Sequence, residues 1–249
     1  METFSIMNIN LTDATMEETE SLILQKITAK LDKETVIYFV NAHTLNTSFQ
    51  NEEFTKTLNT ADYVFGDGTG VRWASKILYK QEPRDNVNGT DLIPRILRDK
   101  RFSKCRCYIL GATQEEITKA ADFFKKNFTQ WELAGFHHGY IINQDCSEII
   151  KEINDSKPDL LLVGMGNPLQ EEWIKKYRKD LKVSVIAGTG GLFTYWAGSL
   201  VRAPLWIRKI GLEWLHILSR QPGQKWKRYL IGNFLFIYRI FQEKKLRKL

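Results

Sequence analysis

The chain has 249 residues, with 36 Lys and Arg against 29 Asp and Glu, so its formal net charge is +7. Hydrophobic residues make up 43% and charged residues 26% of the sequence, which excludes a disordered chain. Three cysteines without a CxxC motif exclude a disulfide framework and favour a reducing compartment. Because the N-terminus lacks the pattern of a signal peptide and no uncharged apolar run reaches about 18 residues, neither a signal peptide nor a transmembrane helix is expected.

The positive charge is concentrated at the C-terminal end. Residues 1–199 contain 24 basic and 27 acidic residues, whereas residues 200–249 contain 12 basic and 2 acidic residues. The same C-terminal segment contains eight aromatic residues. Basic residues interleaved with aromatic ones suit an anionic partner that also has an apolar side, such as a membrane surface or a nucleic acid. A solvated basic face over a helical core is the alternative interpretation.

Residues 1–199 show strand patterns that alternate with helical patterns. Short β-rich runs predict strands at 4–10, 36–41, 63–65, 105–110, 132–136, 160–163 and 183–187. Apolar residues at helical spacing predict helices at 16–31, 52–59, 69–78, 91–98, 114–127, 146–156 and 169–180. This order predicts an α/β fold with a mainly parallel, Rossmann-like sheet flanked by helices.

The pattern changes after about residue 199. Apolar residues at helical spacing predict a helix from Ala203-Pro204 to about residue 218, and a second helix over 225–246. Gln221-Pro222-Gly223 separates the two helices. We therefore predict two units, an α/β domain over 1–199 and a basic, aromatic helical appendage over 200–249.

Four predicted strands are followed by segments rich in small or polar residues. Ligands of parallel sheets bind beyond the carboxyl ends of the strands, where small residues allow close approach and helix N-termini offer N–H groups to phosphate. Each segment alone is explained equally well by tight-turn chemistry, but four on one edge of a sheet exceed that need. None matches GxGxxG or GxxxxGK[ST]. The four segments are Asn41-Ala-His-Thr-Leu-Asn46, Gly66-Asp-Gly-Thr-Gly70, Gly164-Met-Gly-Asn-Pro-Leu-Gln-Glu171 and Gly188-Thr-Gly-Gly191.

Four residues in these segments could take part in chemistry. Asp67 lies between two glycines after a strand, where a carboxylate can act as a general base on a hydroxyl group; a helix N-cap or Asx-turn is the alternative. Asn41 and His43 are expected in the loop at the end of the first of these strands, where His43 could exchange a proton, hydrogen-bond a sugar, or be purely structural. Gln170 could recognise a nucleobase or a sugar hydroxyl, whereas Glu171 also fits a simple interaction with the helix dipole.

The sequence lacks the spacing of common metal sites. It contains no HxH, HExxH or CxxC, and no Asp-x-Asp pair of the kind that holds a divalent ion on a diphosphate. Without such a pair, Arg and Lys would have to neutralise a diphosphate. The C-terminal segment supplies Arg202, Arg208, Lys209, Arg220, Lys225, Lys227 and Arg228.

Five motifs in one order resemble the WecG/TagA/CpsF glycosyltransferases, from about Ile6 to Arg239. They are Asn41-Ala-His-Thr-Leu-Asn46, Ala61-Asp-Tyr-Val-Phe-Gly-Asp-Gly-Thr-Gly-Val71, Val87-Asn-Gly-Thr-Asp91, Gly164-Met-Gly-Asn-Pro-Leu-Gln-Glu171, and Gly198-Ser-Leu-Val-Arg-Ala-Pro204 with Gly211-Leu-Glu-Trp214. The ordered set is specific, although no single motif is. Some members have a Thr where this chain has Phe39, so that a sugar contact by the Thr is not expected here.

The resemblance implies an inverting glycosyltransferase that needs neither metal nor cofactor. Such enzymes move a sugar from a UDP-sugar, often UDP-N-acetylmannosamine, to an undecaprenyl-diphosphate-linked sugar in teichoic acid, enterobacterial common antigen or exopolysaccharide assembly. The Asn-Ala-His-Thr variant suggests UDP-glucose or a related hexose as another donor. The implied location is the inner face of the bacterial cell membrane. There, residues 200–249 would dock on anionic lipid and complete the active site. The resemblance also implies a homo-oligomer.

The resemblance also assigns roles to individual residues. Asp67 would be the catalytic base, and Arg202, Arg220 and Arg228 would bind the diphosphate. The substrate-binding residues would be Asn41, His43, Asn46, Gly66, Arg84, Asn88, Asp91, Gly164, Gly166, Pro168, Gln170, Glu171, Gly188 and Gly190.

Two other functions fit parts of the sequence. The basic, aromatic C-terminal segment would also suit a nucleic-acid-binding module on an α/β scaffold, but this leaves the four strand-end segments unexplained. An NAD-dependent oxidoreductase would use Gly188–Gly191, but the missing GxGxxG motif speaks against it. A glycosyltransferase, which does not bind nucleic acid, is therefore the preferred hypothesis.

Overall fold

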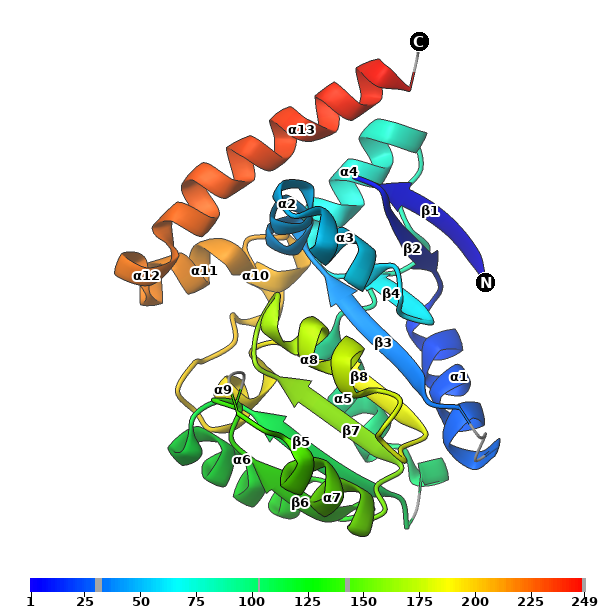
Figure 1. Cartoon of the computed structure of the whole chain (residues 1–249). Coiled ribbons are helices and arrows are strands. Elements are labelled where there is room, and N and C mark those ends of the chain that lie inside the picture. Colours follow the sequence, from blue (N-terminus) through cyan, green and yellow to red (C-terminus); the bar gives the residue numbers. More distant parts are fainter. Residues whose placement is uncertain (30–32, 103, 142–143, 248–249) are drawn as a thin grey trace.

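The fold was examined in a computed structural model that describes residues 1–29, 33–102, 104–141 and 144–247, apart from the side chains of residues 209 and 224 (Figure 1). A six-stranded sheet has the order β4-β3-β8-β7-β5-β6, and every neighbouring pair is parallel. This confirms the predicted Rossmann-like α/β fold. The strands are β3 (Thr35–Val40), β4 (Tyr63–Gly66), β5 (Arg106–Gly111), β6 (Glu132–His137), β7 (Leu160–Gly164) and β8 (Val185–Gly188).

Helices cover both faces of this sheet, because its strands bury side chains on both sides. In β3 all six residues are buried; Val36 and Tyr38 belong to one core cluster, whereas Ile37 and Phe39 belong to the other. This alternation is the two-residue period of a strand. The first cluster includes side chains of α2 (Ala42–Gln50), α3 (Glu52–Leu58), α4 (Thr69–Tyr79), α7 (Ser147–Asp155) and α8 (Leu169–Tyr177). The second includes side chains of α1 (Met16–Ala29), α5 (Gly89–Arg98), α6 (Gln114–Asn127) and α9 (Leu192–Trp196).

One predicted element near the N-terminal end differs from the structure, and a second is described only in part. The strand predicted at 4–10 is an antiparallel hairpin of β1 (Glu2–Ile6) and β2 (Ile9–Asp13), separate from the main sheet. Met7 and Asn8 have φ angles of 49° and 63°, and two successive left-handed residues reverse the chain between the strands. The helix predicted to end at residue 31 is described as far as Ala29, and the remaining predicted residues lie outside the described part of the chain.

The segment 41–46, interpreted from the sequence as a loop, enters helix α2 directly. Asn41 is the N-cap of this helix, and its side-chain oxygen accepts the N–H groups of His43 and Thr44 at 3.0 and 3.1 Å. An asparagine in this position satisfies donors that a helix start otherwise leaves unpaired. The loop interpretation was therefore wrong.

The C-terminal segment forms several helical pieces. They are α10 (Leu205–Lys209), α11 (Glu213–Arg220), α12 (Pro222–Trp226), the π-helical η2 (Lys227–Ile231) and α13 (Gly232–Leu246). The predicted break is confirmed at Gln221, but Pro222 and Gly223 belong to α12, and the predicted first helix is divided at Gly211. This glycine has a φ of 78°, and a Cβ there would lie 2.5 Å from Oγ1 of Thr69.

The predicted appendage has two parts that pack differently. Helices α11 and η2 bury none of their residues, whereas α13 buries Phe236, Arg239 and Ile240, and Phe236 and Ile240 join the first core cluster. Arg239 also donates to the backbone and side-chain oxygens of Asn46 on α2, both at 2.9 Å. We call residues 200–249 the tail and residues 200–231 its outer part. Helix α13, in contrast, is integrated into the core of the α/β unit.

No helix in the described ranges is both long and apolar enough to cross a membrane.

Candidate active site

A cavity of about 1430 Å³ lies between the carboxyl ends of the strands and the tail. Figure 1 shows α10, α11 and α12 beyond this edge of the sheet. The cavity is lined by residues that follow β3, β4, β7 and β8 and, opposite them, by residues of the tail. The four strand-end segments therefore meet at one place, as the sheet topology requires. The predicted site residues that line the cavity are Asn41, His43, Asp67, Asn88, Asp91, Gly164, Gly166, Gln170, Gly188, Gly190, Arg202 and Arg228.

Asp67 follows β4 and is a wall residue of the cavity. Its backbone N–H donates to the carbonyl oxygen of Val40 at 2.8 Å, which fixes the loop beside β3. The N-cap of α4 is Gly68, without a side-chain cap, so Asp67 does not have the capping role that the sequence left open. Burial, followed by repulsion from the Glu213 carboxylate, raises the pKa of Asp67 to about 7. A carboxyl group with this pKa is suited to exchanging a proton near neutral pH.

Asn86 forms a hydrogen bond with the loop that contains Asp67. The N–H of Gly68 donates to Oδ1 of Asn86 at 2.7 Å, and both residues line the cavity. The sequence analysis did not identify Asn86, because an asparagine in a loop between two motifs has no distinctive spacing. Its role became visible only when the fold placed residue 86 beside residue 68.

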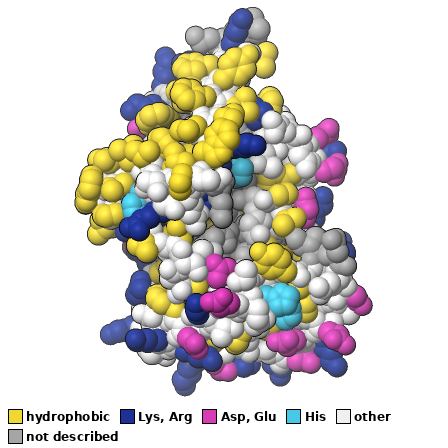
Figure 2. Space-filling model, turned by 90° about the vertical axis from the view of Figure 1, so that its left-hand side faces the viewer, with side chains coloured by type: hydrophobic (Ala, Val, Ile, Leu, Met, Phe, Trp, Pro, Cys, Tyr) yellow, Lys and Arg dark blue, Asp and Glu magenta, His cyan; other side chains and the backbone are white. Residues whose placement is uncertain are grey.

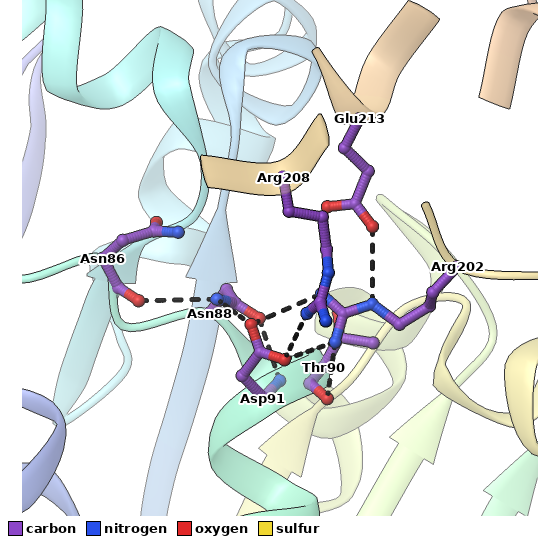
Figure 3. A network of polar contacts seen from close by, with 7 residues as sticks. All are labelled: Asn86, Asn88, Thr90, Asp91, Arg202, Arg208 and Glu213. Carbon is purple, nitrogen blue, oxygen red and sulfur yellow. Dashed lines mark hydrogen bonds and ion pairs between the residues drawn. The ribbon is translucent and has the colours of Figure 1, made fainter. Parts of the chain in front are cut away.

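Two arginines of the tail converge on Asp91 at the start of α5 (Figure 3). Arg202 makes an ion pair with Asp91, and its Nε lies 3.4 Å from Oε1 of Glu213. Nη1 of Arg208 lies 3.0 Å from Oδ1 of Asp91. Although burial alone would raise the pKa of Asp91, the hydrogen bond from Arg202 lowers it below its ordinary value. Asp91 and Glu213 therefore compensate these two arginines, and the contacts to Asp91 tie the outer part of the tail to the α/β unit.

Asn88 orients the side chain of Asp91 for its contact with the two arginines. As the N-cap of α5, Asn88 accepts the N–H of Asp91 at 2.9 Å, and its Nδ2 donates to Oδ2 of the same residue at 2.9 Å. Figure 3 shows these groups on one side of the two guanidinium groups, with Glu213 on the other. Arg208 and Glu213 were not among the predicted site residues. Arg208 was named only among the cations of the C-terminal segment that could neutralise a diphosphate, and the only sequence signal of Glu213 was its position in the Gly211-Leu-Glu-Trp214 motif.

Arg228 and Lys225 bring positive charge to the cavity, and in the described ranges no carboxylate makes an ion pair with either residue. Both line the cavity, and Nε of Arg228 is buried without a hydrogen-bond partner among the described residues. Burial, together with the charges of Arg228 and Lys225, lowers the pKa of His43 to about 4. His43 is therefore a neutral imidazole near pH 7, next to two cations. This side of the cavity is suited to an anionic group such as a phosphate.

Gln170 and Glu171 have different positions on α8. Gln170 lines the cavity, and its Oε1 accepts the N–H of Gly190 at 2.9 Å. Glu171 is fully buried behind this wall, and its Oε1 accepts the Nδ2 of Asn167 and, at 2.7 Å, the Nε2 of Gln170. Burial raises the pKa of Glu171 to about 7, although these hydrogen bonds oppose the shift.

The raised pKa of Glu171 predicts a pH-dependent change in stability. Its folded-state pKa lies above the ordinary value of 4.5, so ionisation opposes folding increasingly as the pH rises from about 4.5 through 7. Glu171→Gln removes this ionisation and is expected to raise the melting temperature more at about pH 8 than at about pH 5. Thermal melts at the two pH values measure this difference. The exposed neighbour Glu172→Gln is the control; an equal change for Glu171→Gln at both pH values would contradict the prediction.

Six predicted site residues do not line the cavity. Asn46 lies on the part of α2 that faces α13 and donates to the carbonyl oxygen of Gly232 at 2.7 Å. Arg84 forms a surface ion pair with Glu18. Gly66 is required by packing, because a Cβ there would lie 2.6 Å from Cγ1 of Val71. The others are Pro168 at the N-cap of α8, Glu171 behind the wall, and Arg220, which is exposed at the end of α11.

Within the described residues, no group of three or more His, Cys, Asp or Glu side chains is arranged to hold a metal ion. The charged residues that line the cavity are Asp67, Asp91, Glu213 and Glu116 of α6, together with cations of the tail.

Known proteins are similar in sequence to this chain over most of its length. The sequence model of the "Glycosyl transferase WecG/TagA/CpsF family" matches residues 4–249. An N-acetylglucosaminyldiphosphoundecaprenol N-acetyl-beta-D-mannosaminyltransferase of Staphylococcus aureus (strain MW2) is 32% identical over 213 residues, which cover 84% of this chain and 80% of that protein. A protein of the same name from Bacillus spizizenii is 31% identical over 224 residues, covering 89% and 86% of the two chains. The chain therefore belongs to the WecG/TagA/CpsF family and is a glycosyltransferase.

Proposed function

We propose that this enzyme transfers a hexose or N-acetylhexosamine from a UDP-sugar to a sugar linked to undecaprenyl diphosphate, in cell-surface polysaccharide biosynthesis. The observation that most supports this is the position of Asp67, whose pKa is raised to about 7, in a cavity that also contains Arg228 and Lys225. The names of the two relatives describe the same class of acceptor and an aminosugar donor.

Asp67 would act as the base in a single displacement. Its carboxylate takes the proton of an acceptor hydroxyl, and the oxygen attacks the anomeric carbon from the side opposite UDP. The bond between the anomeric carbon and the phosphate oxygen breaks, UDP leaves with the electron pair, and the configuration at that carbon is inverted. Arg228 and Lys225 would compensate the charge that develops on the diphosphate, so the proposed reaction needs no metal ion.

A transfer assay tests this function. The full-length protein is incubated with a panel of UDP-sugars, including UDP-N-acetylmannosamine and UDP-glucose, and with an undecaprenyl-diphosphate-linked N-acetylglucosamine. The expected result is UDP release together with a lipid product extended by one sugar. Release of UDP that is independent of the lipid for every donor would contradict transfer to this acceptor.

The pH dependence of the reaction follows from the role of Asp67. Since the base must be ionised, kcat/KM is expected to rise about tenfold per pH unit below pH 7 and to level off at about pH 8. The profile is measured at saturating lipid acceptor in wild type and in Glu171→Gln, which removes the other carboxyl group with a pKa near 7. A profile that is flat from about pH 5.5 to 8 in both proteins would exclude the proposed base.

The tail would bring the enzyme to the inner face of the cell membrane. Figure 2 shows hydrophobic side chains gathered in the upper half of one face, which Figure 1 places over the tail. Large apolar side chains of the tail are strongly exposed, including Phe234 at 77% and Trp206 at 65%. An apolar face bordered by basic residues suits insertion into the interface of an anionic bilayer, next to a lipid-linked acceptor. We define this apolar face as Val201, Leu205, Trp206, Ile210, Leu212, Leu215, Trp226, Leu230, Ile231, Phe234, Ile237, Tyr238 and Phe241.

Removal of two aromatic anchors is expected to weaken membrane binding. The double variant Trp206→Ser and Phe234→Ser should bind phosphatidylglycerol vesicles at least about tenfold more weakly than wild type, because each buried aromatic ring contributes roughly 1.5–3 kcal/mol. Sedimentation with vesicles measures the binding. Tyr140→Ser is the control, since Tyr140 is equally exposed outside the tail. Binding of wild type to RNA but not to vesicles would instead favour a nucleic-acid partner.

A further inference from the structure

Glu171 connects the segments that follow β3, β7 and β8 without lining the cavity. Oε1 of this fully buried carboxyl group accepts both the Nδ2 of Asn167 and the Nε2 of Gln170, and Oε2 has no partner among the described residues. Asn167 and Gln170 line the cavity, whereas Glu171 lies behind them. The group is therefore in contact with the wall of the site but not with its interior.

The direction of each amide depends on this contact. Because both NH₂ groups point to Glu171, both amide oxygens point away from it. Oε1 of Gln170 accepts the N–H of Gly190 at 2.9 Å. Oδ1 of Asn167 lies 3.4 Å from Oγ1 of Thr44, which also lies 3.3 Å from Oδ1 of Asn41. These contacts extend from the segment after β7 to the start of α2, which follows β3, and to the loop after β8.

The alternative amide orientations are unfavourable at this place. A flipped Gln170 would direct its oxygen at the Glu171 carboxyl group and its NH₂ at the N–H of Gly190, which leaves buried donors and acceptors unpaired. There is also little space for adjustment, because a Cβ on Gly188 would lie 3.0 Å from Nε2 of Gln170. The acceptor atom of residue 171 thus selects one orientation of Gln170 and fixes the backbone of Gly190.

This wall is suited to the donor nucleotide rather than to the lipid. Gly166 and Gly190 line it, and a Cβ on either would meet no atom within 4 Å, so that a nucleotide can come close to their backbone. The opposite wall, formed by the tail, contains the apolar residues Ile210, Leu230 and Phe234.

We propose that Glu171 is a positioning residue for donor binding, which acts by fixing Gln170, Asn167 and, through Gln170, the loop at Gly190. This inference rests on the proposed function, because it assigns the wall to the UDP-sugar. The requirement is for a hydrogen-bond acceptor at the place of Oε1. A glutamine at position 171 can supply that acceptor, whereas a leucine cannot.

The test compares Glu171→Leu with Glu171→Gln. Glu171→Leu is expected to raise the KM for the UDP-sugar and the Kd for UDP at least about tenfold, with kcat within about threefold of wild type. For Glu171→Gln, the KM, the Kd and kcat should all stay within about threefold of wild type. On a Gln170→Ala background, Glu171→Leu should have a much smaller effect than on wild type, because the group that it positions is missing. If Glu171→Leu does not fold, Glu171→Met provides an unbranched apolar replacement of similar size.

The outcomes separate the two proposals. Unchanged UDP binding in the apolar variant, equal losses in the apolar and glutamine variants, or additive effects with Gln170→Ala would each overturn the positioning role. Binding of UDP, followed by calorimetry, requires no acceptor. Wild type that binds UDP but transfers no sugar would therefore contradict the proposed function while leaving the role of Glu171 testable.

Discussion

Asp67→Asn is expected to lower kcat by a factor of about 10² to 10⁴ while UDP still binds, because the amide cannot take a proton from the acceptor hydroxyl. The substitution keeps the size of the side chain, and no hydrogen bond to the Asp67 carboxylate is present in the described part of the chain whose loss could unfold the loop. Since burial raises the pKa of Asp67, the neutral amide should also be tolerated by the fold. Steady-state transfer kinetics and UDP calorimetry measure the two expectations.

Asp122→Asn is the matched control for Asp67→Asn. Asp122 is exposed on α6, outside the residues that line the cavity, and should leave kcat unchanged. If Asp67→Asn retained the kcat of wild type, another group would have to be the base. A loss of UDP binding equal to the loss of kcat would mean that Asp67 binds the donor instead of activating the acceptor.

Arg228→Met is expected to lower kcat/KM for transfer by about a hundredfold, the size of effect seen when one stabilising donor is removed from a developing oxyanion. Arg228 lines the cavity, and in the described ranges no carboxylate makes an ion pair with it. Arg202 and Arg208, in contrast, already contact Asp91. The UDP leaving group should therefore depend most on Arg228. Kinetics at varied UDP-sugar concentration measure the loss.

Arg220→Met distinguishes a local effect from a change in net charge. Both variants remove one positive charge from the tail, but Arg220 is exposed at the end of α11 and does not line the cavity. It should change kcat/KM by less than about threefold. Equal losses in the two variants would show that the tail acts through its total charge and not through an arginine in the cavity.

The sheet could be predicted from the sequence because its strands are buried on both faces and appear as short apolar runs. β3 and β7 are of this kind, with every residue buried. Helix α2 was missed because its nine residues contain few apolar positions and begin directly at the end of a strand, with Asn41 as the cap. The β1–β2 hairpin was read as one strand because Met7 is not a typical residue for positive φ angles, and Asn8, which tolerates them, lacks the following glycine of an Asn-Gly turn.

The location of the site followed from topology, but the direction of its side chains did not. The rule for parallel sheets correctly brought the four strand-end segments together. Residues within one motif nevertheless face different ways: Gln170 lines the cavity, and its neighbour Glu171 is buried behind it. In the same way, arginines of the tail differ only in the orientation of short helices, so that Arg208 contacts Asp91 while Arg220 faces solvent. Sequence spacing contains no information on such tertiary packing.

The measurement that tests the central claim most directly is sugar transfer in the presence of excess EDTA. In the proposed mechanism Asp67 activates the acceptor, and cations of the tail compensate the diphosphate. Wild type is therefore expected to transfer the sugar to the lipid acceptor at an unchanged rate with EDTA. The Arg228→Met variant should remain slow whether or not Mg²⁺ is added. Loss of wild-type transfer in EDTA, restored by a divalent cation, would contradict this mechanism.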